Sequence, residues 1–385
     1  MIKNTENSDN QKGNKTMQKF NTENEKIKHK YYDFLKESQG YSELTINAIK
    51  KAIYRYEEYS DFEEFSKFNQ KRAVEFKKWL EAKTDPKTKK QISISTVYQY
   101  VRNLKDFFKW LCYQVGYKSK ICLTDVEFLR LPKEKVRLAV SQKREHYPTI
   151  EQVRKVIYSI KINNEIDLRD RALFSFTFLS GMRDSAIVSL PIGCFDEETL
   201  KVNQDPKLGV KTKFSKHIKS VLFKFDDDML CYFLGWIRYL KTEKLFGNAD
   251  PVFPKNLVQN AEDAKSFFSN SVEPKFWQSV TSMREIFKQR FEFAGVEYFP
   301  PHAFRHLAVI TSVAKCKNGH EIKAVSQNFG HEDVGTTMTT YGTLTNTQMN
   351  GLISNMNFLA SDTDNQADII AKFQDFLKQQ EKGNF

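Results

Sequence analysis

The sequence predicts a mainly α-helical chain with a small β-sheet, divided into two domains. The chain has 385 residues, which is long for one domain and suits two. Apolar residues recur at helical spacing over most of it, as in the stretch Val97–Leu111. The alternating apolar pattern of a strand is confined mainly to a short region near residues 200–225.

Positive charge is concentrated in the N-terminal part. The net charge is +12, and residues 1–150 hold 31 Lys and Arg against 20 Asp and Glu, whereas residues 151–385 hold 29 against 28. A basic domain is suited to a phosphate backbone, although a basic surface can also serve solubility alone. The five cysteines are scattered without a C-x-x-C pair, which argues against disulfides or a zinc site. The apolar runs are too short to span a membrane.

The N-terminal part predicts about four helices. Residues 1–25 are polar, with almost no apolar periodicity, and we expect them to be disordered. Within residues 26–123, three side chains are positioned to cap helices: Ser42, Asn69 and Ser95. The clearest helix follows the third of these caps and carries one apolar stripe: Val97, Tyr100, Val101, Leu104, Phe107, Phe108 and Leu111.

A second helical domain is expected after a linker. Residues 124–148 mix charge with two prolines, show no clear period, and are interpreted as that linker. Thr149 and Gln152 then have the spacing of a capping box. A strongly apolar helix follows at about 167–180 and ends at Gly181. Arg183 comes directly after it, so a rigid scaffold holds this side chain, although a lone arginine there more often caps helix carbonyls.

The rest of the second domain predicts a short β region followed by helices. We expect a strand near Leu200–Val202, and another in which Val221, Phe223 and Phe225 alternate. Helices are expected at about 227–245 and 276–294, with a polar loop between them. FPPHAFRH begins the next helix with prolines at its entrance, and EIKAVSQNFG is a short helix ending at Gly330.

Two arginines, two histidines and a late tyrosine suggest phosphodiester chemistry. His302 and Arg305 are three residues apart and share a helix face. His331 follows a glycine, and Tyr341 comes ten residues later in a Thr-rich run. A pentacovalent phosphate carries negative charge that two arginines, one of them Arg183, can stabilise. Histidines supply donors near neutral pH, and a tyrosine can hold a cleaved strand covalently.

This arrangement resembles the catalytic domain of the tyrosine recombinases, also called phage-type integrases. The resemblance covers about residues 149–355 by motif and 28–135 by helix pattern. It implies a helical core-binding (SAM-like) domain over 26–123 and a tyrosine-recombinase catalytic domain over 149–360. Residues 361–385 contain the amphipathic run IIAKFQDFL and are expected to form a tail helix that docks on a neighbouring subunit. The motifs that carry the resemblance are Arg183, His302-x-x-Arg305-His306, Gly330-His331 and Tyr341.

The resemblance also assigns roles. Tyr341 is the nucleophile that forms a 3′-phosphotyrosyl link, and the two arginines, with His302 and His331, stabilise the transition state. His306 is expected to be a structural neighbour of the site. Lys211, in a Lys-Thr turn before a strand, matches the family's acid, with Lys213 and Lys216 as rivals.

Two positions leave the site open to other interpretations. The family commonly has a carboxylate three residues after its first arginine, but Ala186 stands there and Asp184 is adjacent instead. The identity of the acidic group that supports the site is therefore open. Tyr298 is a weaker rival to Tyr341 because it precedes the histidine–arginine motif, out of family order.

The resemblance implies double-stranded DNA as the partner and a tetramer on paired sites. It implies no metal, no nucleotide and no other cofactor, and a cytoplasmic protein near the nucleoid. A type IB topoisomerase-like enzyme and a non-catalytic DNA-binding protein on the same fold remain the alternatives. The expected DNA contacts in the basic part are Lys50, Lys51, Arg55, Lys87, Lys89, Lys90, Arg102 and Lys105.

Overall fold

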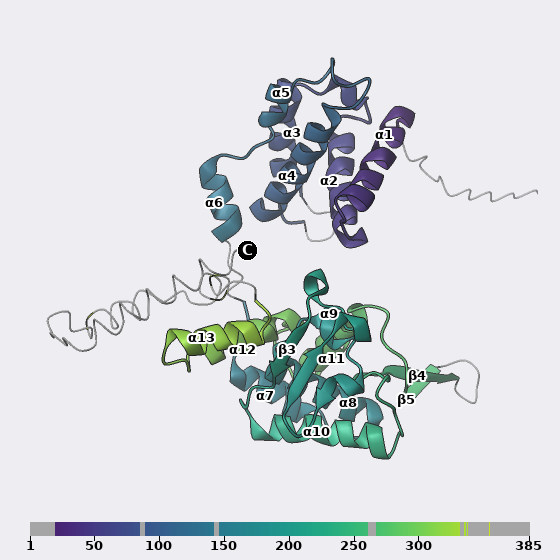
Figure 1. Ribbon diagram of the computed structural model, residues 1–385, viewed down its shortest axis with the longest axis vertical. Helices are drawn as coiled ribbons and strands as arrows, with labels where there is room; N and C mark the ends of the chain where they lie inside the picture. The colour runs from purple at the N-terminus through teal and green to yellow at the C-terminus, as the bar shows by residue number, and fades with distance from the viewer. Residues whose placement is uncertain are drawn as a thin grey trace, which may run out of the picture. The chain divides into compact units, whose positions relative to one another are not determined.

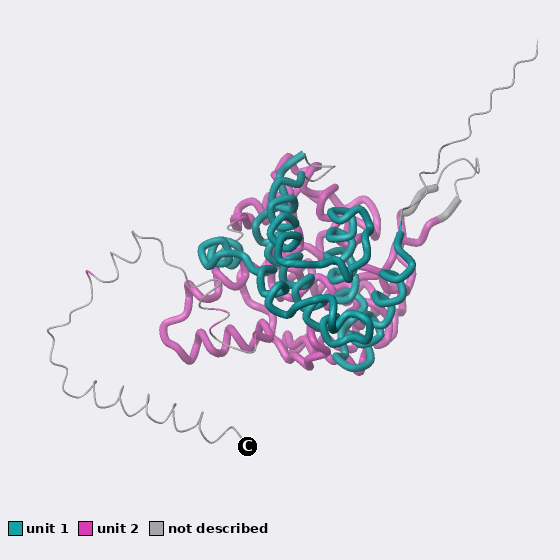
Figure 2. Tube along the Cα trace, turned by 90° about the horizontal axis from the view of Figure 1, so that it is seen from above, with its two compact units in different colours: residues 1–143 teal, residues 144–385 magenta. Residues whose placement is uncertain are grey.

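The computed structural model describes residues 20–84, 89–141, 146–260 and 267–331, together with residues 335, 337 and 354. The chain forms two compact units, residues 1–143 and 144–385 (Figure 2). Both are built mainly from helices, and small antiparallel sheets occur in the second, so the predicted fold class is confirmed.

The first unit contains the helices expected from the sequence and two more. Ser42 and Asn69 cap α2 and α3 as predicted, by accepting from the backbone N–H groups of Thr45 and Arg72. The third cap differs, because α4 begins one residue after Ser93, which accepts from Thr96. The helices are α1 (Thr22–Asp33), α2 (Glu43–Tyr59), α3 (Gln70–Ala82), α4 (Ile94–Leu111), α5 (Leu123–Glu127) and α6 (Lys133–Ser141).

Aromatic rings fill the core of the first unit around α4. Its predicted stripe is buried, with Tyr100 only partly so. Phe108 stacks on Phe68 with ring centroids 3.9 Å apart, and Tyr56 lies against the same ring edge-on. The stripe is therefore core, which leaves the opposite face of α4 available for partners.

Two expectations for the first unit need correction. Residues 124–148 contain α5 and α6 rather than only a linker: α6 packs on α4, and Lys135 pairs with Glu81 on α3 at 2.7 Å. The sequence obscured α6 because two of its apolar residues, Leu138 and Val140, are exposed and blur the period. Ordered structure also begins earlier than residue 26, since Asn21 caps α1 at Thr22.

The second unit is organised around α8, which is buried along most of its length. Phe174 on α8 packs with Phe287 of α11 and Phe304 of α12, so one aromatic cluster joins three helices. The capping box at Thr149 and the left-handed end of α8 are both confirmed. The helices, labelled in Figure 1, are α7 (Ile150–Ser159), α8 (Glu165–Ser180), α9 (Asp184–Ile187), α10 (Asp227–Thr242), α11 (Thr281–Phe293), α12 (Pro301–Val313) and α13 (Gly319–Asn328).

Two antiparallel sheets accompany these helices. The first has the order β1 (Phe195–Asp196), β2 (Lys201–Gln204), β3 (Ile218–Val221), so β3 is an edge strand. β3 ends before the predicted alternation does, and Phe223 and Phe225 instead stack on each other with centroids 5.0 Å apart.

The second sheet is a hairpin of β4 (Lys255–Asn260) and β5 (Phe267–Glu273), where the sequence predicted a loop. Side chains of α8 hold its base: Arg169 donates to the carbonyl of Pro254, and Glu165 accepts from the N–H of Val272. These contacts are tertiary, and the strands themselves are largely polar, so the local pattern did not reveal them.

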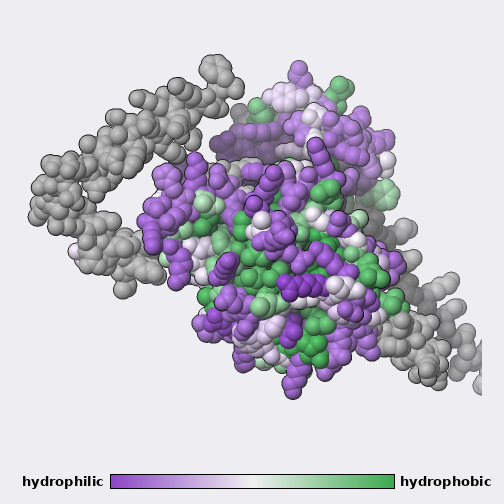
Figure 3. Space-filling view, turned by 60° about the horizontal axis from the view of Figure 1, so that its bottom comes forward, coloured by the Kyte–Doolittle hydropathy of each residue, from purple (hydrophilic) through white to green (hydrophobic). Residues whose placement is uncertain are grey.

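On the face that Figure 3 displays, hydrophilic side chains cover most of the coloured surface and apolar side chains gather towards its middle. Within the part of the chain that the structure describes, no helix is long and apolar enough to cross a membrane.

Candidate active site

Arg305 is the centre of the candidate site. It lies on α12 and is only 3% exposed. Its Nη1 donates to the carbonyl of Gly181 at 2.7 Å, and its Nη2 donates to the carbonyl of Phe329 at 2.8 Å. These carbonyls stand at the C-terminal ends of α8 and α13, where helix carbonyls lack partners within the helix. One guanidinium therefore joins the ends of two helices that are far apart in sequence.

Glycines make this junction possible. Gly181 has φ 54° and Gly330 has φ 67°, a left-handed conformation that other residues adopt at a cost. A Cβ at Gly181 would collide with the ring of Phe329, and one at Gly330 would lie 2.5 Å from Cδ1 of Ile218. Both glycines thus end a helix and permit close packing directly beside Arg305.

His331 is bonded to Arg305 through its Nε2, with 2.9 Å between that atom and Nη2. A guanidinium can only donate, so Nε2 accepts and the ring proton is on Nδ1. Nδ1 lies 2.8 Å from Oγ1 of Thr337, which is fully buried and accepts the hydrogen bond from Nδ1–H. Burial, then the charges of Arg305, Arg183 and Lys216, lower the pKa of His331 to about 4. The imidazole is therefore neutral at physiological pH.

Arg183 and His302 lie near this pair. Arg183 occupies the turn between α8 and α9, two residues after Gly181, and its charge lowers the pKa of both histidines. The His302 ring reaches the surface on the first turn of α12, with its centroid 5.1 Å from that of His306. The pKa of His302 is lowered to about 4, first by loss of part of its hydration and then by the charges of His306 and Arg305. The structure thus brings together Arg183, His302, Arg305 and His331.

Asp184 is the carboxylate beside this cluster. It accepts from Nη2 of Arg284 at 2.7 Å, and its charge acts to raise the pKa of His302. Ala186, which occupies the position where the family has an acid, is 1% exposed and belongs to the core. Asp184 is therefore the acidic group that the geometry offers in its place.

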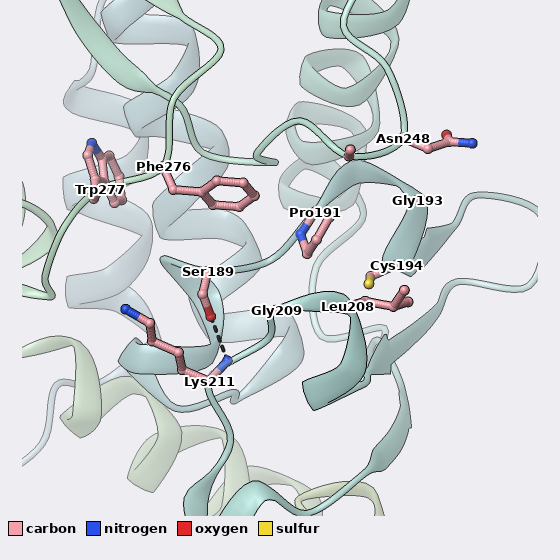
Figure 4. Close-up of a pocket in the computed structure, with 11 residues that line it drawn as sticks. Ser189, Pro191, Gly193, Cys194, Leu208, Gly209, Lys211, Asn248, Phe276 and Trp277 are labelled. Carbon is pink, nitrogen blue, oxygen red and sulfur yellow. Dashed lines mark hydrogen bonds between the residues drawn. The ribbon is translucent and has the colours of Figure 1, made fainter.

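The three candidate lysines occupy different surroundings on the β2–β3 connection, residues 205–217. The N–H of Lys211 donates to Oγ of Ser189 at 2.8 Å, and its exposed side chain lines a cavity of about 610 Å³ with Phe276 and Trp277 (Figure 4). Lys216 is partly buried, and its charge contributes to the lowered pKa of His331.

The third lysine, Lys213, lies with its Nζ 4.7 Å from the ring centre of Phe214, an exposed residue. The Lys-Thr turn of the sequence favours Lys211 as the acid, whereas the effect of Lys216 on the pKa of His331 favours Lys216.

Several expected residues lie outside the described part of the chain, among them Tyr341, Lys87 and the tail helix of residues 361–385. The rival tyrosine, Tyr298, is described: its ring meets Phe291 edge-on, and burial raises its pKa. Thr337 was missed by sequence reasoning because nothing distinguishes it from the other threonines of its run.

The expected DNA contacts of the first unit divide into two groups. Arg55 is bound to Glu58 at 2.5 Å, and Lys105 is 8% exposed and bound to Glu127 at 2.8 Å, so neither is poised for phosphate. The other described members are exposed: Lys50, Lys51, Lys89, Lys90 and Arg102. Among the described residues there is no group of three or more His, Cys, Asp or Glu that could hold a metal ion.

Comparison with known proteins gives relatives over most of the chain. A tyrosine recombinase XerC from Lactobacillus leichmannii is 22% identical over 314 residues, which is 81% of this chain and 92% of the relative. A tyrosine recombinase XerD from Pasteurella multocida is 23% identical over 193 residues, or 50% of this chain and 56% of the relative.

Solved structures share the fold at lower identity. A lambda integrase dimer (residues 75–356 of that protein) bound to a COC′ core site superposes with a TM-score of 0.57 at 13% identity, covering 82% of this chain and 94% of that one. The XerH recombinase bound to difH gives 0.54 at 16% identity, over 85% and 84% of the two chains. The Phage integrase family model matches residues 149–348, which include the whole cluster around Arg305. The chain therefore belongs to the phage integrase family, the tyrosine recombinases.

Proposed function

We propose that this chain is a site-specific DNA recombinase that cuts and rejoins strands through a 3′-phosphotyrosyl intermediate. Family membership supports this reaction class. The solved relatives include a Tn1549 transposon integrase in complex with transposon right end DNA, with a TM-score of 0.54 at 14% identity over 85% of this chain and 98% of that one. DNA-bound neighbours on the same fold are consistent with double-stranded DNA as the partner.

The observation that carries the proposal is the buried Arg305 bound to His331 close to Arg183. Two guanidinium groups supply fixed positive charge for the non-bridging oxygens of a pentacovalent phosphate, and preorganised charge of this kind usually contributes more to catalysis than any other effect. His331 accepts from Arg305 and so orients its fork. His302 offers a donor from the first turn of the same helix.

Strand cleavage requires one proton to leave the attacking tyrosine and another to reach the leaving 5′ oxygen. The Tyr341 oxygen attacks phosphorus and passes its proton to the neutral imidazole of His302, while the bond from phosphorus to the 5′ oxygen breaks. A lysine of the β2–β3 connection, Lys211 by motif or Lys216 by position, protonates that leaving oxygen. The 5′ hydroxyl of a partner strand then attacks the phosphotyrosine and returns a proton to the lysine. The bond from phosphorus to the Tyr341 oxygen breaks, and that oxygen takes back the proton held by His302.

This route needs neither a metal nor ATP, because the energy of the phosphodiester is retained in the tyrosyl bond and arginines supply the charge. Exchange between two sites requires several active subunits, so we propose a tetramer on paired sites. The tail after Ser361 docks on a neighbouring subunit in this scheme, and truncation there should abolish paired-site complexes while leaving binding to a single site.

Trapping of a covalent adduct tests the proposal without knowledge of the target. Wild-type protein is incubated with a randomised double-stranded DNA library, denatured in detergent, and the DNA that stays attached is sequenced. Tyr341→Phe should bind the recovered site with unchanged affinity and form no adduct, because only the phenolic oxygen is lost. Tyr298→Phe is the matched control and should form adducts as the wild type does.

The same assay separates the alternatives. Adduct formation by Tyr341→Phe would contradict the assignment of the nucleophile. A wild-type protein that binds DNA but never forms an adduct would be a non-catalytic DNA-binding protein. An enzyme that relaxes a supercoiled plasmid carrying the recovered site, yet never joins strands from two such sites, would be topoisomerase-like.

A further inference from the structure

We propose that Asn328 is a positioning residue that holds the β2–β3 connection, and with it the lysine acid, against the C-terminal end of α13, three residues before His331. The inference rests on the proposed function, because it concerns protonation of the leaving 5′ oxygen. It assigns to a single amide side chain the coupling of two segments that are 107 residues apart in sequence.

The side chain of Asn328 pairs with β3 as another strand would. Its Oδ1 accepts from the N–H of Val221 at 2.7 Å, and its Nδ2 donates to the carbonyl of Val221 at 3.0 Å. β3 is an edge strand that pairs with β2 on its other side, so the outer main-chain groups of Val221 would otherwise face solvent. Since the N–H only donates and the carbonyl only accepts, both bonds fix the same orientation of the amide.

A second contact lies at the start of the same strand. Ile218, the first residue of β3, packs so close to Gly330 that a Cβ on the glycine would meet it at 2.5 Å. Asn328 and Gly330 thus hold the strand at both its ends. Both belong to the segment that runs directly into His331, so β3 is fixed relative to the imidazole.

The lysines lie just before this anchored strand. Lys216 precedes β3 by two residues, and its carbonyl accepts from Oγ1 of Thr212 at 2.6 Å. The other end of the segment is held where the N–H of Lys211 donates to Ser189. The main chain on either side of the lysines is therefore fixed, so a lysine side chain would approach a phosphate from a fixed main-chain position.

A structural role alone is the competing explanation, and the two differ in the chemistry they affect. A pair of hydrogen bonds at a partly exposed edge contributes about 1 kcal/mol each to stability. Loss of stability alone would slow cleavage of every substrate equally. Loss of acid positioning would slow only the substrates whose leaving group needs a proton.

The test compares single-turnover cleavage of two substrates that carry the trapped site. One is native DNA, and the other has a 5′-bridging phosphorothiolate, whose sulfur leaves without protonation. Asn328→Leu removes both hydrogen bonds, and Asn328→Asp keeps the acceptor but sets a carboxylate against the carbonyl of Val221. Gln327→Leu, at an exposed neighbouring position on α13, is the matched control.

We expect both Asn328 variants to cleave native DNA on the order of 10- to 100-fold more slowly, since general acid catalysis is worth about 10²–10⁴. On the phosphorothiolate, the cleavage rates of both Asn328 variants should come within about threefold of the wild-type rate. The same recovery is expected of whichever lysine variant, Lys211→Ala or Lys216→Ala, cleaves native DNA more slowly. The control should match wild type on both substrates. Amide exchange at Val221 should accelerate in Asn328→Leu, which verifies the lost bond independently of catalysis.

Equal slowing on both substrates, or no slowing on native DNA, would overturn the role of Asn328. Failure of both lysine variants to recover on the phosphorothiolate would overturn it as well, because no acid would then lie on the connection. A wild-type protein that forms no adduct with either substrate would instead refute the proposed function itself, and this inference with it.

Discussion

The positive charges expected to act on DNA are held in opposite ways in the two compact units. In the first, Lys51, Lys89 and Arg102 are exposed, and a lysine that is buried is paired with a carboxylate, as Lys105 is with Glu127. In the second, Arg305 is buried and donates to two backbone carbonyls and an imidazole.

Exposed charges and a buried, hydrogen-bonded guanidinium suit two different tasks, binding of DNA and action on a single phosphate. Exposed charges act on a whole DNA backbone through a field that salt screens, whereas a buried guanidinium acts on one phosphate with fixed geometry. Partners that are carbonyls leave the net charge of the guanidinium intact, while a carboxylate would neutralise it. We therefore expect the first unit to govern affinity and the Arg305 cluster to govern the rate of cleavage.

Replacement of Arg305 should have the largest effect. Arg305→Ala removes a transition-state donor, which costs on the order of 10²–10³ in rate, and it leaves two helix-end carbonyls unpaired at about 1–3 kcal/mol each. Arg305→Lys should not restore cleavage, because an ammonium cannot span both carbonyls and the imidazole. Single-turnover cleavage and thermal unfolding measure the two parts. A lysine variant with near-normal cleavage would show that charge alone, not the fork, is what the site needs.

The sequence predicted this cluster better than its surroundings. Local sequence signatures mark three of its features: the end of α8 at Gly181, the start of α12 before His302, and the glycine before His331. The carbonyl partners of Arg305 leave none, because they depend on how α8 and α13 meet in space. The β4–β5 hairpin was missed for a similar reason, since Arg169 on α8 holds it.

The helix-end glycines offer a second test of the fixed geometry. Gly330→Ala should cost about 1–2 kcal/mol for a left-handed Cβ and should also displace Ile218, so cleavage should fall about tenfold beyond any change in stability. Gly295→Ala is the control, because Gly295 has φ 61° but open space around it. Cleavage rates after correction for the folded fraction decide the matter. Equal rates in the two variants would mean that the contact with β3 is irrelevant to the chemistry.

The exposed lysines of the first unit should affect binding instead. The combined replacement of Lys87, Lys89 and Lys90 by Gln should reduce the slope of log affinity against log salt by up to about 3. Each phosphate contact contributes about 0.9 to that slope. The rate of cleavage by bound protein should stay unchanged. The charge-matched control replaces three exposed lysines of the second unit by Gln and should leave the slope nearly as it was: Lys161, Lys241 and Lys288. An unchanged slope in the first triple variant would show that this cluster does not touch DNA.

The smallest effect should come from the protonation of His331, and it tests whether the imidazole accepts from Arg305. Its pKa is lowered to about 4, against about 6.5 in an unfolded chain. As pH falls below about 6.5 the unfolded ring takes up a proton first, so stability decreases between about pH 6.5 and 4 and is unaffected above that window. The ring signal of His331 should show no titration by NMR between pH 8 and 5. His331→Gln should flatten the fall in unfolding free energy, and His302→Gln, at an exposed ring, should flatten it less. A titration of His331 near pH 6.5 would mean that Nε2 is free to take a proton, and the orientation assigned to Arg305 would then be wrong.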